Sequence, residues 1–110
     1  MDARRSQRIP LSTPLHLLSL DPMYVFSVHC NTVDVSCHGC RLVAPCAFQH
    51  KTRLRLTVLS SNRSTTAHVV RSIPVQPGPQ VDAWYVAVEL DAPGNVWGVE
   101  SPPPDWLMIV

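Results

Sequence analysis

The sequence predicts an all-β domain folded as a small six-stranded antiparallel barrel, and three observations support this. Short runs rich in β-branched and aliphatic residues alternate with turn residues along most of the chain. The connections between these runs are too short for a crossover helix, so neighbouring strands are expected to be antiparallel. Eleven prolines in 110 residues, about twice the usual share of roughly 5%, would interrupt any long helix. A sheet of this kind is expected to close, because closure removes its exposed edges.

The chain divides into an arm, a barrel and a tail. Residues 1–12 are polar and carry three arginines without apolar partners, which predicts a flexible N-terminal arm. Residues 13–91 hold the expected strands, which are Pro14–Leu20, Tyr24–Val35, Gly39–Val43, Thr52–Leu59, Thr65–Ile73 and Ala83–Leu90. Residues 92–110 are expected to form a tail that packs on the barrel through Trp97, Val99 and Trp106, with a short helix from Pro104.

Two of the expected strands show which of their faces is buried. In the fourth strand the apolar residues Leu54, Leu56 and Val58 alternate with polar ones, which is typical of a half-buried strand. The last strand repeats the pattern, with one face formed by Trp84, Val86, Val88 and Leu90 and the other by Tyr85, Ala87 and Glu89. Ser60, Ser61 and Asn62 are turn-forming residues and are expected to connect the fourth and fifth strands.

Composition and charge exclude several classes of function. The chain is 45% hydrophobic and 15% charged, against about 25% charged in an average domain, so we expect it to fold rather than be disordered. A net charge of +1 provides no broad basic field, so DNA and RNA are poor candidate partners. The apolar run Leu15–Leu20 is too short for a signal peptide or a membrane span. We therefore expect a cytoplasmic protein without membrane insertion, whose cysteines are reduced thiols.

The arm and one turn carry the candidate binding residues. Arginine presents a planar fork that pairs with phosphate and with the edge of guanine, so Arg4, Arg5 and Arg8 suit a phosphorylated purine. At the end of the second strand, Asp34 could accept from a guanine N–H edge and Ser36 offers a hydroxyl, while Gly39 allows close approach. Each pattern also has a plain interpretation, a solubilising tail for the arginines and an ordinary hairpin turn for Asp34 and Ser36.

Together these segments resemble the PilZ family. RRSQR at Arg4 to Arg8 matches the family signature R-x-x-x-R, and DVSCHG at Asp34 to Gly39 matches D/N-x-S-x-x-G. The strands GCRLVAP, TRLRLTVL, AHVVRS and YVAVEL follow in the family's order, so the resemblance covers roughly residues 4–91. The chain differs from the family in having Gln49, His50 and Lys51 before the fourth strand and Ala87 in the last one, where glycines are usual, and in lacking a long C-terminal helix.

The resemblance implies a PilZ-type barrel that binds the bacterial second messenger cyclic di-GMP. It further implies that Arg4 and Arg8 clamp phosphate and guanine as the arm folds over the ligand, while Asp34 and Ser36 hold a guanine edge and Gly39 leaves room for it. On this interpretation the protein is a receptor and not an enzyme, it needs no cofactor, and it acts on a downstream protein partner. The alternative is a PilZ-like protein-interaction module that binds no nucleotide.

The cysteines allow a metal interpretation, which the spacing favours less. Four thiols, Cys30, Cys37, Cys40 and Cys46, lie near two histidines and could form a tetrahedral zinc site in a zinc-stabilised barrel. However, the chain has only one C-x-x-C pair, whereas structural zinc sites usually combine two knuckles. A catalytic Cys–His pair lacks a third residue to orient it. We therefore predict no metal and no catalytic residue, and we expect the cysteines and tryptophans to serve packing.

Overall fold

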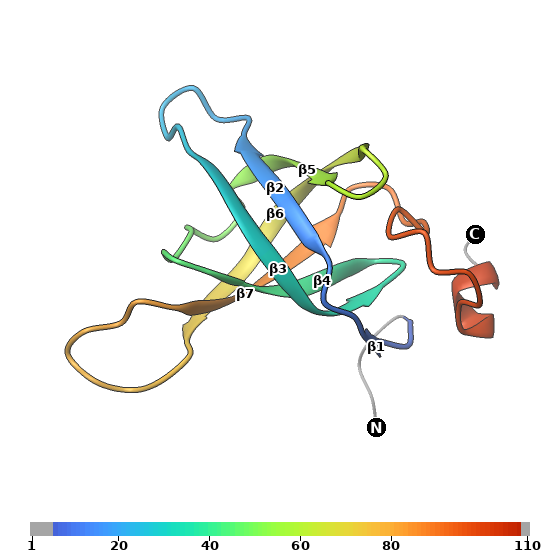
Figure 1. The fold of residues 1–110 in the computed structure, drawn as a ribbon. Coiled ribbons are helices and arrows are strands. Elements are labelled where there is room, and N and C mark those ends of the chain that lie inside the picture. The colour runs from blue at the N-terminus through green and yellow to red at the C-terminus, as the bar shows by residue number, and fades with distance from the viewer. Residues whose placement is uncertain (1–5, 109–110) are drawn as a thin grey trace.

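The computed structural model describes residues 6–108 and shows a closed antiparallel barrel (Figure 1). Its strands are β1 (Ile9–Pro10), β2 (Pro14–Ser19), β3 (Ser27–Ser36), β4 (Gly39–Ala44), β5 (Arg53–Val58), β6 (Arg63–Pro74) and β7 (Trp84–Leu90). The sheet order is β1-β3-β2-β5-β6-β7-β4, and an additional pairing of β3 with β4 closes a barrel of six strands. The predicted fold class is thus confirmed, with β1 as an additional short strand.

Strict alternation in the strands builds the core. In β5, Leu54, Leu56 and Val58 are fully buried, while Arg53 and Arg55, which alternate with them, are exposed. Each buried aliphatic side chain contributes roughly 1.5–3 kcal/mol relative to an exposed one, which makes the barrel interior the main source of stability. In β7, Val86, Val88 and Leu90 are buried as predicted, whereas Trp84 at the end of the strand is only half-buried.

Some boundaries differ from the prediction for local reasons. β3 begins at Ser27 rather than at Tyr24, because the chain before it forms a turn. In that turn the Met23 amide donates to the Asp21 carboxylate, at 2.9 Å, and the Ser19 hydroxyl donates to the Tyr24 carbonyl, at 2.5 Å. β1 lies within the predicted arm and pairs with the last residues of β3, so the segment from Gln7 to Pro10 runs beside the predicted binding turn.

The C-terminal tail lies beside the same end of the barrel. After β7 it leads to a short 3-10 helix, η1 (Pro104–Met108), which Figure 1 shows on the side of the barrel where β1 lies. Trp97 and Trp106 are buried, with 6% and 3% of their surface exposed, and both belong to the core cluster. Within residues 6–108, no helix has the length and apolar character that crossing a membrane would require.

Candidate functional site

The structure brings the described candidate residues to one end of the barrel. Asp34 and Ser36 end β3, Gly39 begins β4, and Arg8 directly precedes β1. The β1–β3 pairing sets Pro10 opposite Asp34, which explains why Arg8 reaches the turn. Arg4 and Arg5 lie outside the described residues, so their predicted role stays a prediction.

Asp34 is the electrostatic centre of this cluster. Its Oδ2 accepts a hydrogen bond from Nη2 of Arg41 at 3.1 Å, while its Oδ1 lies 3.9 Å from Nη1 of Arg8. The carboxylate is 17% exposed, and its Oδ1 is buried without a hydrogen-bond partner among residues 6–108. Buried carboxylate oxygens are normally hydrogen-bonded, so this acceptor is available to a donor from outside residues 6–108.

Arg41 is a site residue that the motif did not indicate. It faces Asp34 across the β3–β4 hairpin, because the antiparallel register pairs these two positions. Its Nε is buried without a hydrogen-bond partner in the described part of the chain, and its guanidinium carbon lies 5.1 Å from the centre of the Tyr85 ring. The register of the β3–β4 hairpin could have identified Arg41 from the sequence, because Arg41 lies two residues after Gly39 and pairs with Asp34.

Ser36 and Gly39 are held tightly by their surroundings. The Ser36 hydroxyl accepts a hydrogen bond from the His38 amide at 3.2 Å, and its carbonyl accepts one from the Trp97 indole at 2.7 Å. A Cβ on Gly39 would collide with the carbonyl oxygen of Val88 on the neighbouring strand. The backbone of β7 occupies the space that a side chain at position 39 would need, because β7 approaches β4 closely at this point.

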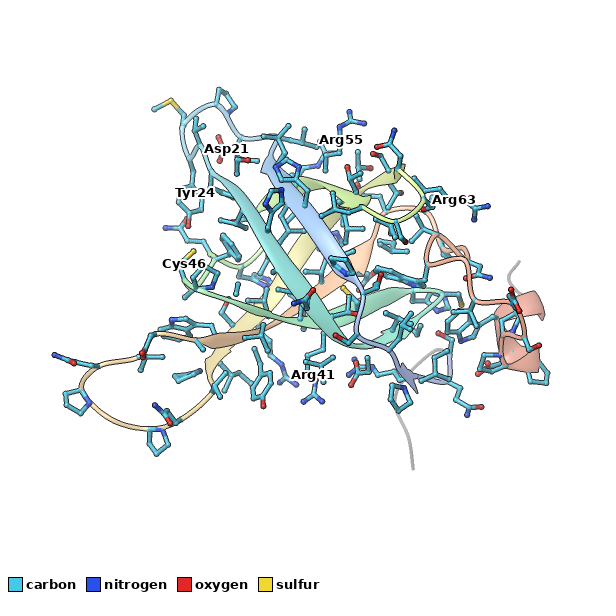
Figure 2. The ribbon with its side chains drawn as sticks, viewed as in Figure 1. Asp21, Tyr24, Arg41, Cys46, Arg55 and Arg63 are labelled. Atoms are coloured by element: carbon cyan, nitrogen blue, oxygen red, sulfur yellow. The ribbon has the colours of Figure 1, made fainter. Side chains whose placement is uncertain are left out.

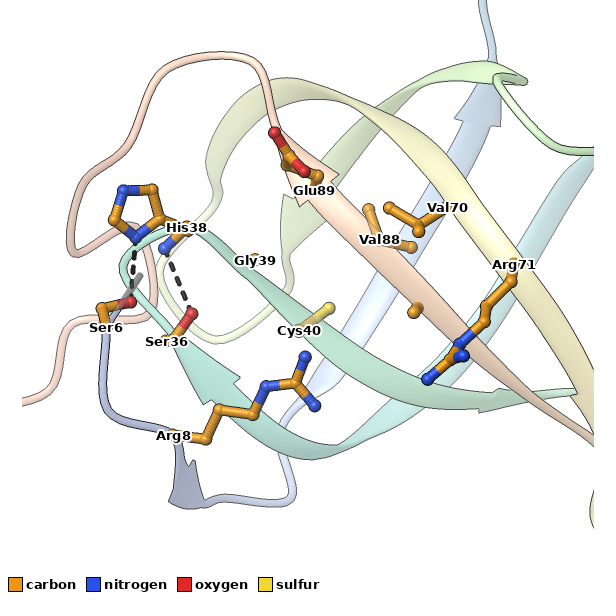
Figure 3. A pocket seen from close by; sticks show the side chains of 11 residues that line it. Ser6, Arg8, Ser36, His38, Gly39, Cys40, Val70, Arg71, Val88 and Glu89 are labelled. Carbon is orange, nitrogen blue, oxygen red and sulfur yellow. Dashed lines mark hydrogen bonds between the residues drawn. The ribbon is translucent and has the colours of Figure 1, made fainter. Parts of the chain in front are cut away.

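A pocket opens beside these residues. It has a volume of about 250 Å³ and is here called the motif pocket; its lining residues are Ser6, Arg8, Ser36, His38, Gly39, Cys40, Val70, Arg71, Ala87, Val88 and Glu89. Figure 3 shows Arg8 and Arg71 extending toward the same space from opposite sides. The Ser6 hydroxyl lies 2.9 Å from Nδ1 of His38 and ties the N-terminal segment to the turn. Arg71 and His38 were not predicted as site residues.

Three of the four cysteines are buried in the core, whereas Cys46 is exposed. Cys37 and Cys40 are buried, and burial, aided by the nearby Cys46 thiol, raises the pKa of Cys30 to about 11. Burial likewise raises the pKa of Cys40. Thiols with raised pKa values stay protonated at neutral pH, which makes them poor nucleophiles. No group of three or more metal-ligating side chains is found among residues 6–108.

Comparison with known proteins identifies the family of the fold. The family model described as PilZ domain matches residues 2–94. Among solved structures, the chain is similar to one described as MrkH, a c-di-GMP-dependent transcription regulatory factor, with 14% sequence identity and a TM-score of 0.58. The match covers 81% of this chain and 43% of that one, so this chain spans less than half the length of the structure it resembles. No match was found among curated proteins.

Proposed function

Because the chain belongs to the PilZ family, we propose that it is a receptor for cyclic di-GMP whose N-terminal arginines close over the bound nucleotide. The observation that carries this proposal is the juxtaposition of Asp34 with Arg8, which lines the motif pocket. A cation and an acceptor at one site match a ligand that presents phosphates together with N–H edges. The role is binding and signalling rather than catalysis.

Asp34 supports recognition of guanine. Its Oδ1 is buried and accepts no hydrogen bond from residues 6–108. The N1–H and N2–H groups of guanine form a donor edge that would satisfy this oxygen, and a hydrogen bond to a charged acceptor contributes about 1.5–3 kcal/mol. Adenine lacks that pair of donors, so this contact would also favour guanine over adenine.

Arg8 supports recognition of phosphate. Its distance of 3.9 Å from Asp34 is long for an ion pair, and its side chain is 38% exposed. Exposed ion pairs contribute about 0–1 kcal/mol, so Arg8 loses little when it turns to another anion. A phosphate offers it a bidentate, charge-assisted contact, which is stronger. Asp34 keeps its closer partner Arg41 during this exchange. Arg4 and Arg5 are proposed to contribute to the same clamp.

The similarity to MrkH also supports the choice of ligand, because that protein is described as c-di-GMP-dependent. Transcriptional regulation is not carried over, since this chain spans less than half of that structure and its net charge is only +1. We propose instead that the ligand-bound barrel acts on a downstream protein partner.

Isothermal titration of the purified protein with cyclic di-GMP, with GTP as control ligand, tests this function. We expect saturable binding of cyclic di-GMP that is lost in Arg8→Ala and in Asp34→Ala. Asp34→Asn keeps an acceptor oxygen without the charge and should bind more weakly than the wild type but more tightly than Asp34→Ala. Arg55→Ala is the matched control, because Arg55 is exposed on β5, far from Arg41 in Figure 2.

Either of two results would contradict the proposal. A folded protein that releases no heat with high micromolar cyclic di-GMP would favour the protein-interaction module. Binding that persists in both alanine variants would place the nucleotide elsewhere on the barrel. Thermal unfolding of each variant without ligand is the necessary check, because a variant that unfolds reports on structure rather than on recognition.

A further inference from the structure

A second hollow adjoins the motif pocket on the outer face of the barrel. It has a volume of about 130 Å³ and is here called the arginine pocket; its lining residues are Arg8, Arg41, Arg71, Ile73, Tyr85 and Ala87. Arg8, Arg71 and Ala87 line both pockets, so the two hollows are neighbours that share part of their walls. Neither family motif includes Arg41, Arg71 or Tyr85.

The sheet register explains why the hollow forms there. Asp34 pairs with Arg41, Arg41 pairs with Ala87, and Ala87 pairs with Arg71. These four residues therefore form one row across β3, β4, β7 and β6, and paired residues point to the same face of a sheet. Ala87 is the smallest member of the row and lies between two arginines. Its methyl group leaves the space that the long side chains surround.

The charge of the arginine pocket is not balanced by its lining. Its walls carry three guanidinium groups and no carboxylate. Asp34 is close to Arg8 and Arg41, but Arg71 makes no ion pair or hydrogen bond with any other residue of 6–108. The buried Nε of Arg41 likewise has no acceptor in this range. Unsatisfied donors around a hollow of positive charge indicate an anionic ligand.

The aromatic ring gives the pocket a second chemical feature. Arg41 lies over Tyr85 at 5.1 Å from the ring centre, which keeps a planar guanidinium at the pocket wall. Planar cations of this kind stack on purine bases as well as pairing with phosphates. The arginine pocket therefore suits a base joined to a phosphate, the same chemistry as the motif pocket next to it.

We propose that one cyclic dinucleotide spans both pockets, an inference that rests on the proposed function. Cyclic di-GMP consists of two identical guanosine-phosphate halves. One half lies in the motif pocket beside Arg8, whose neighbour Asp34 accepts from the guanine edge, and the other half lies in the arginine pocket against Arg71 and the Arg41–Tyr85 pair. Arg71 is thus a ligand-binding arginine contributed by β6, in addition to those of the N-terminal segment.

Titration of Arg71→Gln with cyclic di-GMP tests this inference. Arg71 is exposed and unpaired within the described chain, so the variant should unfold at the wild-type temperature. Removing a charge-assisted contact should weaken binding about tenfold or more while the stoichiometry stays at one ligand per chain. Arg55→Gln changes the net charge equally and should bind like the wild type, which separates a local contact from general electrostatic attraction.

The outcomes distinguish the inference from the proposed function. Wild-type affinity in Arg71→Gln would overturn the inference and leave the receptor function intact. Two ligands per wild-type chain, of which Arg71→Gln loses one, would also overturn it, because the arginine pocket would then hold a second molecule. A folded wild-type protein that binds no cyclic di-GMP would overturn the receptor function and the inference together.

Discussion

The Gly39→Ala substitution would place a methyl group where β4 and β7 come closest together. The added Cβ would overlap the carbonyl oxygen of Val88, and it would lie 3.1 Å from the Cα of Glu89. Both neighbours are backbone atoms of a strand that is paired on both sides, so no side chain can rotate away to relieve the overlap. Either β7 must shift or the end of the β4–β7 ladder must open.

The size of this effect follows from the geometry. Overpacking in a well-packed site costs typically 1–3 kcal/mol, and a collision with backbone belongs at the upper end, so we expect a loss of about 3 kcal/mol. One kcal/mol lowers the melting temperature of a domain of this size by roughly 4–8 °C, so the shift should reach about 10–25 °C. Since small domains are stable by only about 5–15 kcal/mol, this is a large share of the total.

Thermal and urea unfolding without ligand measure this effect, with Gly94→Ala as control. A Cβ on Gly94 meets no atom within 4 Å, and its amide keeps the 2.8 Å bond to the Cys37 carbonyl, so that variant should unfold like the wild type. If Gly39→Ala unfolds with the control and loses only nucleotide binding, the glycine serves the ligand. The argument from strand approach would then be wrong.

Two further predictions concern the tail and the pH dependence. Trp106→Phe removes the 2.7 Å hydrogen bond from the indole to the Gln7 carbonyl but keeps an aromatic ring. Hydrogen exchange of the amides around Gln7 should therefore accelerate, and the affinity for cyclic di-GMP should fall severalfold. Unchanged amide exchange would refute this role of Trp106. A hydrogen bond from Thr66, together with one from His68, holds the pKa of Asp91 below its ordinary value. The ionised Asp91 carboxylate therefore stabilises the fold above the unfolded-state pKa of about 3.9, and this stabilisation is lost as the pH falls through the lower pKa of the folded state. Urea unfolding should therefore show Asp91→Asn less stable than the wild type at pH 7 and closer to it at pH 2, and a gap that does not change with pH would contradict the assignment.

The barrel could be predicted because its signals are local. Runs of β-favouring residues between turn residues predicted the six barrel strands, and alternation at Leu54, Leu56 and Val58 showed which face of one of them is buried; both signals depend only on neighbours along the chain. β1 was missed because two residues, Ile9 and Pro10, are too few to show a period. The motif residues of the turn could likewise be found because their spacing is fixed along the chain.

What escaped prediction depends on pairing between distant segments. Arg71 joins the row of Arg41 and Ala87 only because a bulge after Val69 shifts the register of β6 against β7. A shift of one residue moves a side chain to the other face of the sheet, so the composition of the outer face cannot be read from one strand alone. The arginine pocket is accordingly a product of topology, which no single motif contains.

The contacts of the C-terminal tail bear on whether the entropy cost of ordering the N-terminal segment arises during folding or during ligand binding. The Gln7 amide donates to the Asp105 carboxylate at 2.6 Å, and its carbonyl accepts from Trp106, so neighbouring tail residues hold this peptide from both sides. Ordering a residue costs about 1–2 kcal/mol of backbone entropy. A tail that holds the segment before Arg8 in place pays this cost during folding rather than during ligand binding. If the proposed function holds, the affinity for cyclic di-GMP should then depend on tail residues that lie nearly a hundred positions away in sequence from Arg8.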